Sequence, residues 1–132
     1  MQINQMISFY GLFFVLSLFG FNVQAAVAID SESDVAGSWV LESAAAKLNG
    51  SRVERGETWI IGSGQLEKKG LLMARSGTYD VPPVPIKIES GKMLVAVVGR
   101  LGKFNEYELV EKVGDTMVLY ARSEGFLFFK RK

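Results

Sequence analysis

Short runs of β-prone residues, separated by turn residues at regular intervals, constrain the fold of this 132-residue chain most strongly. Strands that recur about every 8–12 residues with turn signals between them indicate an all-β sandwich or barrel. Connections this short favour antiparallel neighbours, because parallel pairing needs a crossover of about a dozen residues or more. The breaks between the runs are Gly62/Gly64, Lys69-Gly70, Ser76-Gly77, Pro82-Pro83, Ser90-Gly91, Gly99/Gly102, Gly114-Asp115 and Glu124-Gly125.

The runs between these breaks are the expected strands. We expect them at Ser38–Ser43, Glu57–Ile61, Gly64–Lys68, Leu71–Ser76, Thr78–Val81, Ile86–Glu89, Lys92–Arg100, Phe104–Lys112, Thr116–Arg122 and Phe126–Arg131. The alanine run in Glu42–Leu48 favours helix. One short helix or a wide loop is therefore expected after the first strand.

The first 28 residues contain no Asp, Glu, Lys or Arg, and Ile7–Phe21 is apolar except for two serines. A helix over this segment reaches about 22 Å, which is shorter than the roughly 30 Å hydrocarbon core of a bilayer. The length fits the apolar region of a secretory signal peptide, and the small residues that follow fit a cleavage site. We therefore expect export to the periplasm or the medium, with cleavage after Ala25 or, alternatively, after Ala28.

The expected organisation is a signal peptide at 1–25, a flexible N-terminal arm at 26–36 and a single β-barrel domain at 37–132. The arm is assigned from its small, polar and acidic residues. Residues 1–6, which precede the apolar segment, carry no Lys or Arg, and this departs from the usual signal-peptide pattern. An uncleaved membrane anchor therefore stays open as the alternative, whereas cleavage leaves no stable membrane span.

Composition excludes several classes of chemistry. The chain has no His and no Cys, so Ser-His-Asp relays, Cys-His pairs and most zinc sites cannot be built. Fifteen basic residues against fourteen acidic ones create no net field for nucleic acid. Glu106 and Glu108 share a strand face, where a solvated surface is the simpler interpretation than a carboxylate pair for glycoside hydrolysis. We expect no catalytic residues, no metal, no cofactor and no nucleic-acid partner.

Two expected strands are apolar on both faces, at Met93–Val98 and Phe126–Phe129. An antiparallel barrel normally leaves one face of each strand wet, so something must cover the second apolar face. One interpretation is coverage by the alanine-rich segment or by a thick core. The other is an exposed apolar patch for a partner, with Phe126, Phe128, Met93 and Val95 as its residues.

Three short motifs occur in an order that resembles small bacterial lipocalin-like domains. They are Gly37-Ser38-Trp39 at the opening of the first strand, Ser76-Gly77-Thr78-Tyr79 in the middle, and Phe128-Phe129-Lys130-Arg131 at the end. The resemblance implies an up-and-down barrel of about eight strands. It also implies that Gly37, Trp39, Tyr79 and Arg131 are structural, with Arg131 (or Arg122) stacked on the Trp39 indole at the closed end. Many large aromatic residues favour a filled interior.

These features together predict a binding module rather than an enzyme. The leading hypothesis is an exported barrel that recognises a protein partner in the cell envelope. A second hypothesis is a carrier of a small apolar ligand inside the barrel. A third follows from a resemblance to bacterial inhibitors of secreted metalloproteases, whose N-terminal arm enters the protease cleft. Those inhibitors carry a Cys pair that this chain lacks.

Overall fold

The computed structural model describes residues 27–73 and 77–132, which form one antiparallel sheet and a single turn of 3₁₀ helix. The elements are η2 (Glu32–Asp34), β2 (Gly37–Ala45), β3 (Arg52–Glu54), β4 (Thr58–Gly62), β5 (Gln65–Leu72), β6 (Thr78–Glu89), β7 (Lys92–Ala96), β8 (Phe104–Val113), β9 (Thr116–Ala121) and β10 (Gly125–Arg131). Across these residues, no helix is long and apolar enough to cross a membrane.

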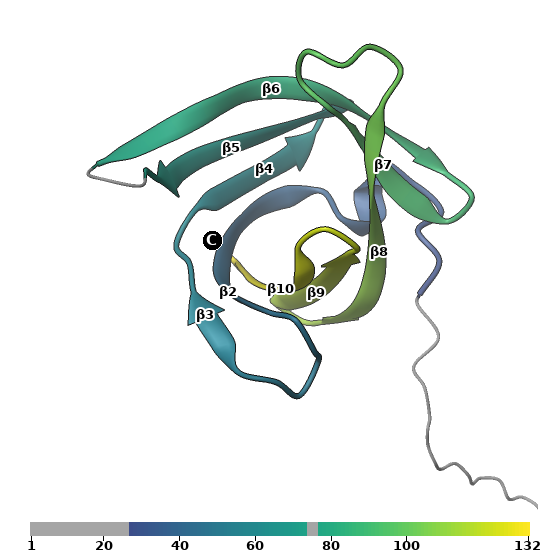
Figure 1. Cartoon of the computed structure of the whole chain (residues 1–132). Coiled ribbons are helices and arrows are strands. Elements are labelled where there is room, and N and C mark those ends of the chain that lie inside the picture. The colour runs from purple at the N-terminus through teal and green to yellow at the C-terminus, as the bar shows by residue number, and fades with distance from the viewer. Residues whose placement is uncertain (1–26, 74–76) are drawn as a thin grey trace, which may run out of the picture.

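The sheet closes on itself as an up-and-down barrel. From β4 to β10 each strand pairs with the next in the sequence, and β2 pairs with both β4 and β10. Eight strands therefore form the ring seen in Figure 1, and the ninth, β3, adds to one edge of β2. This is the all-β antiparallel barrel that the spacing of the turn residues predicts.

The interior of the barrel is filled by side chains that alternate along the strands. Trp39 and Leu41 of β2, Trp59 and Ile61 of β4, and Tyr107 and Leu109 of β8 all point inward and are buried. The largest side chains that are almost fully buried are Trp39, Trp59, Tyr107, Phe129, Ile29, Leu41, Leu66, Met93, Met117, Leu119, Leu127 and Val35. An eight-stranded barrel is just wide enough for side chains to fill it.

One end of the barrel is closed by residues from both ends of the domain. The Arg131 guanidinium lies over the Trp39 ring, 4.2 Å from its centroid, and the Trp39 indole N–H donates to the Val35 carbonyl at 3.0 Å. Gly37 has φ +134°, and a Cβ built there would lie 2.5 Å from Arg131 Nη1. Only glycine fits where the chain enters the barrel beneath that guanidinium. The stacking partner of Trp39 is therefore Arg131, and Arg122 lies at the opposite end.

Residues 27–36 pack against this closed end, where the sequence predicted a mobile arm. Val27 N–H donates to the Leu109 carbonyl at 2.7 Å, and Ile29 N–H donates to the Gly91 carbonyl at 2.9 Å. Ile29 is 1% exposed and Val35 is fully buried, so both belong to the core. The acidic residues of the segment suggested an arm in solvent, but the intervening apolar side chains anchor it.

Two sequence-based expectations about individual elements are wrong, in addition to the break at Lys69-Gly70, through which β5 runs continuously from Gln65 to Leu72. The alanine run does not form a helix: β2 continues to Ala45, because Ala44 and Ala45 pair with β10 and β3, and residues 46–51 form a loop, which is the alternative to that helix. A Cβ on Gly125 would meet the Ala45 carbonyl oxygen at 2.5 Å. The second error is a break at Pro82-Pro83. β6 is continuous from Thr78 to Glu89, because its first half pairs only with β5 and β7 pairs only from Ile86 onward. Proline is tolerated on such an unpaired edge.

The other end of the barrel is open and carries the longer connections. These are the segments 46–51 and 55–57 on either side of β3, 97–103 and 122–124. The β5–β6 hairpin extends beyond the ring of strands in Figure 1, toward the left of the view. We call this open end the mouth; it lies opposite the Trp39–Arg131 pair.

Candidate functional site

The four residues of the expected apolar patch do not form one surface. Met93 and Val95 lie on the inward face of β7 and are buried in the core. Phe126 and Phe128 lie on the outward face of β10, with the core residues Leu127 and Phe129 between and beyond them. The patch that contains all four residues is therefore wrong, because alternation along β7 and β10 sends the two pairs to opposite faces.

Side chains of this chain cover both outward-facing phenylalanines in part. The Arg52 guanidinium of β3 lies 3.6 Å from the centroid of the Phe128 ring. Phe126 packs on Tyr120 of β9, with 4.8 Å between ring centroids. The additional strand β3 thus explains why β10 is apolar on both faces.

Tyr79 does not have the structural role that the resemblance implies. It lies near the tip of the β5–β6 hairpin, is 46% exposed, and pairs in register with Leu71. Gly77 of the same motif is at the tip with φ +73°, whereas Ser76 lies outside the described residues. Tyr79 therefore lies at the edge of the mouth, on the β5–β6 hairpin, and not in the core.

The mouth contains a buried carboxylate that the sequence analysis missed. Glu57 is 4% exposed, and its side chain points into the barrel because it lies at alternate positions with the buried Trp59 and Ile61. One carboxylate oxygen accepts from Arg55 Nε at 3.1 Å and from Nη2 at 2.5 Å, while the other accepts from the Trp59 indole N–H at 2.9 Å. Both oxygens of Glu57 are thus occupied, which is the condition under which a charge is tolerated in a barrel interior.

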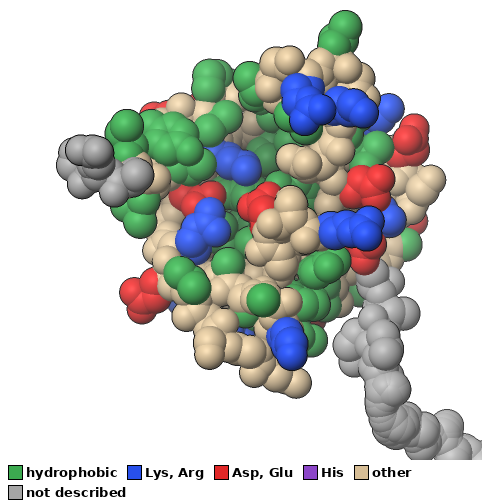
Figure 2. Space-filling model, viewed as in Figure 1, with side chains coloured by type: hydrophobic (Ala, Val, Ile, Leu, Met, Phe, Trp, Pro, Cys, Tyr) green, Lys and Arg blue, Asp and Glu red, His purple; other side chains and the backbone are tan. Residues whose placement is uncertain are grey.

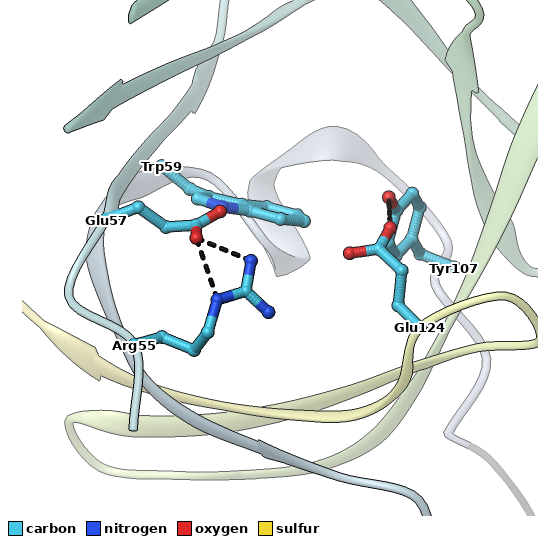
Figure 3. A network of polar contacts seen from close by, with 5 residues as sticks. All are labelled: Arg55, Glu57, Trp59, Tyr107 and Glu124. Atoms are coloured by element: carbon cyan, nitrogen blue, oxygen red, sulfur yellow. Dashed lines mark hydrogen bonds and ion pairs between the residues drawn. The ribbon is translucent and has the colours of Figure 1, made fainter. Parts of the chain in front are cut away.

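A second polar pair faces the first one across the mouth. Tyr107 on β8 donates its hydroxyl to Glu124 Oε2 at 2.5 Å, and Glu124 lies in the turn between β9 and β10. Burial, together with the neighbouring carboxylates Glu124 and Glu57, raises the pKa of the Tyr107 phenol. Figure 3 shows Arg55 and Glu124 on opposite sides of the opening, each directed toward the space between them.

Lys68 adds a fourth charged side chain to the mouth, after Arg55, Glu57 and Glu124. It shares the inward phase of β5 with the buried Leu66, and its ammonium nitrogen lies 4.2 Å from the centroid of a Trp59 ring. Burial lowers the pKa of Lys68, and the nearby carboxylates Glu124 and Glu57 partly oppose this effect. No ion pair of Lys68 occurs among the described residues, in contrast to Lys69, which lies 3.8 Å from Glu67.

Two hollows adjoin these charges. The larger, about 610 Å³, is lined by Ala44, Ala45, Ala46, Ser51, Val53, Arg55, Tyr120, Arg122, Ser123, Glu124 and Gly125. The smaller, about 150 Å³, lies between the mouth and the hairpin and is lined by Arg55, Gly56, Glu57, Gly70, Leu71, Leu72 and Tyr79. Figure 2 shows charged side chains of both signs around a hollow at the centre of this face.

The hairpin supplies an apolar lip beside the charged opening. Leu72 is 74% exposed, and Met73 and Tyr79 are about half exposed. Isolated exposed apolar residues are common on protein surfaces, but a group at a protruding hairpin tip is typical of an interaction surface. The lip and the charges together make the mouth a mixed surface, apolar at the rim and ionic at its centre.

The carboxylates noted on β8 belong to an outer surface, as the sequence indicated. Glu106 and Glu108 both face Lys92, whose ammonium lies 3.2 Å and 3.5 Å from them. These carboxylates raise the pKa of Lys92. Within the described part of the chain, no group of three or more acidic side chains is placed to hold a metal ion.

The mouth residues carried a signal in the sequence. Glu57 precedes Trp59 and Ile61 at alternate positions, and Lys68 follows Leu66 in the same way, so each charge continues an inward-facing apolar phase. A charged residue in that phase marks the point where a filled interior becomes an open one.

Comparisons with family models, curated proteins and solved structures found no match.

Proposed function

We propose that this chain is an exported binding module of lipocalin-like architecture that recognises a protein partner through its mouth. The observation that carries the proposal is the contrast between the two ends of the barrel. One end is sealed by an apolar plug and a stacked arginine. The other gathers three basic and acidic side chains over the floor formed by Trp59, namely Arg55, Glu57 and Lys68, beside an apolar lip.

A stable fold alone does not require these charges. Replacing a buried ion pair by apolar residues of similar size is often neutral or stabilising. Side chains such as Arg55, Glu57 and Lys68 therefore favour a recognition role, in which a polar partner completes their contacts. Aromatic and arginine residues beside a hollow are also typical of protein-binding surfaces.

The packing of the interior favours a protein partner over a small apolar ligand. Trp59, Tyr107 and Phe129 pack edge to face in the centre of the barrel, with ring centroids 5.0–5.6 Å apart. A carrier would need that space for its ligand. An inhibitor that used residues 27–36 as an arm would first have to detach Ile29 and Val35 from the core.

Site-specific photo-crosslinking in the native envelope tests this proposal. A photoreactive residue replaces Leu72 on the lip or, as the matched control, Val113, which is 62% exposed next to the closed end. We expect a discrete crosslinked protein with the Leu72 probe that is absent with the Val113 probe, and we expect the purified partner to bind the purified chain. Equal crosslinking at both positions, or none at Leu72, would contradict the proposal.

A further inference from the structure

We propose that the mouth binds the carboxylate of a polypeptide C-terminus, with Lys68 and Arg55 as the cationic groups. This inference rests on the proposed function and specifies the chemistry of the partner. It is carried by the bonds that the described residues make and by those that they leave open.

Two cationic side chains of the mouth have donor groups without an acceptor among the described residues. Arg55 uses Nε and Nη2 on Glu57, and Figure 3 shows its remaining nitrogen directed away from Glu57 into the opening. The Lys68 ammonium rests on Trp59 without an ion pair among the residues that the structure describes. Glu57 lies near enough to act on the charge of Lys68 but bonds to Arg55 and Trp59, and it forms no ion pair with Lys68 within the described part of the chain.

The remaining acceptor also restricts the ligand. Glu124 uses one oxygen to accept from Tyr107, and its other oxygen accepts no hydrogen bond from the residues that the structure describes. The negative charges of Glu124 and Glu57 disfavour a doubly charged anion such as phosphate, because like charges in a partly buried site repel strongly. A peptide terminus fits both requirements: it carries one negative charge and an adjacent amide N–H.

The lip accounts for the side chain of such a ligand. The hollow of about 150 Å³ has Arg55 and Glu57 on one side and Leu71, Leu72 and Tyr79 on the other. An apolar side chain next to the terminal carboxylate would lie against the hairpin. The expected ligand is therefore an extended polypeptide that ends in an apolar residue.

N-acetyl-leucine is a minimal probe for this site, because it has the carboxylate, the amide N–H and the apolar side chain. N-acetyl-leucinamide differs only in lacking the charge. A probe of this size is expected to bind with a Kd on the order of millimolar. The two indole N–H signals of the chain report on opposite ends of the barrel, Trp59 beneath the mouth and Trp39 at the closed end.

The experiment is a nuclear magnetic resonance titration of protein isolated from cells that express the full-length chain. We expect a saturable shift of the Trp59 indole signal with N-acetyl-leucine, no shift of Trp39, and no saturable shift with N-acetyl-leucinamide or inorganic phosphate. Lys68→Met is expected to weaken binding by about tenfold or more, since it removes a partly buried charge contact. Lys69→Met removes an exposed charge on the other face and is expected to change the Kd by less than about twofold.

An equal response to the amide, unchanged affinity in Lys68→Met, or the absence of a saturable Trp59 shift would each overturn this inference. The Trp39 signal shows that each variant is folded. If the titration fails while Leu72 still crosslinks specifically to a partner, the carboxylate assignment is wrong and the proposed function stands. If the crosslinking is equal at both ends, the proposed function itself is wrong.

Discussion

Arg131 and Trp39 are partners twice, as register neighbours between β10 and β2 and as a guanidinium stacked on an indole. The two strands close the barrel, so the stack lies where the last strand returns to the first. The same indole donates to the Val35 carbonyl in the segment that covers this end. The Trp39 side chain on β2 thus links the segment before β2 with the last strand, β10.

Trp39→Ala is expected to lower the free energy of unfolding by about 3–5 kcal/mol, as large aromatic deletions from cores do. The loss includes the indole contacts, the stack with Arg131 and the bond to Val35. Chemical denaturation with fluorescence or circular dichroism measures it. Leu101→Ala, at a fully exposed position in the β7–β8 connection, is the control and should change stability by no more than about 0.5 kcal/mol.

Gly37→Ala is expected to destabilise the fold through a backbone and a steric effect together. The residue has φ +134°, and the added Cβ would lie 2.5 Å from Arg131 Nη1. Gly99→Ala is the matched control, because Gly99 also has positive φ but no atom within 4 Å of an added Cβ. A double-mutant cycle with Arg131→Ala isolates the steric part: the combined loss should be smaller than the sum of the single losses. Strict additivity would show that the guanidinium does not restrict this position.

Arg55→Met is expected to lower the free energy of unfolding by about 2 kcal/mol, because it leaves the buried Glu57 carboxylate without its cation. This expected loss is small for a buried ion pair, because the Arg55 side chain is 31% exposed and water screens the pair. The double variant with Glu57→Met should recover most of that loss in urea denaturation. A double variant less stable than Arg55→Met would contradict this account of the pair.

Tyr107→Phe is expected to change how stability depends on alkaline pH. Burial raises the pKa of the folded phenol above its ordinary value of 10.0. Above pH 10 the unfolded chain therefore loses this proton while the folded chain keeps it, so the free energy of unfolding falls as pH rises. In Tyr107→Phe this part of the alkaline loss should be absent. Leu101→Ala, at a fully exposed position without a titratable group, should retain the wild-type slope between pH 9 and about 11.

The mature N-terminus is expected to be Ala26 rather than Ile29. Cleavage after Ala28 would remove the Val27–Leu109 bond and place an α-ammonium on Ile29, which is 1% exposed. Burying a charged amine without a partner is costly. The intact mass of the exported protein distinguishes the two sites. A mass that corresponds to cleavage after Ala28 would show that the Val27–Leu109 bond is dispensable for this packing.

The barrel architecture was predictable because it depends on patterns that repeat along the whole chain. Glycine-containing turns and alternating apolar residues specify antiparallel neighbours, and these patterns place most strands within a few residues of their observed bounds. The closed end was accessible only through the resemblance. Nothing local in the sequence indicates that Arg131 reaches Trp39, because 92 positions separate them.

The errors arose where a contact distant in the sequence overrides a local preference. Ala44 and Ala45 favour helix by propensity, but lie in a strand because they pair with β10 on one side and with β3 on the other. Met93 and Val95 looked like surface candidates, since a continuous apolar run does not indicate which face is covered. The partners of Glu57 and Lys68 required the register between strands.

A residue-by-residue chemical-shift map of the labelled chain with its purified partner tests most directly whether the mouth is the binding surface. The account predicts that the perturbed amides cluster at the mouth, around Gly56, Leu72 and Glu124, and that the closed end, including Ile29 and Asp115, stays unchanged. Perturbations confined to the closed end, with the mouth unaffected, would contradict it.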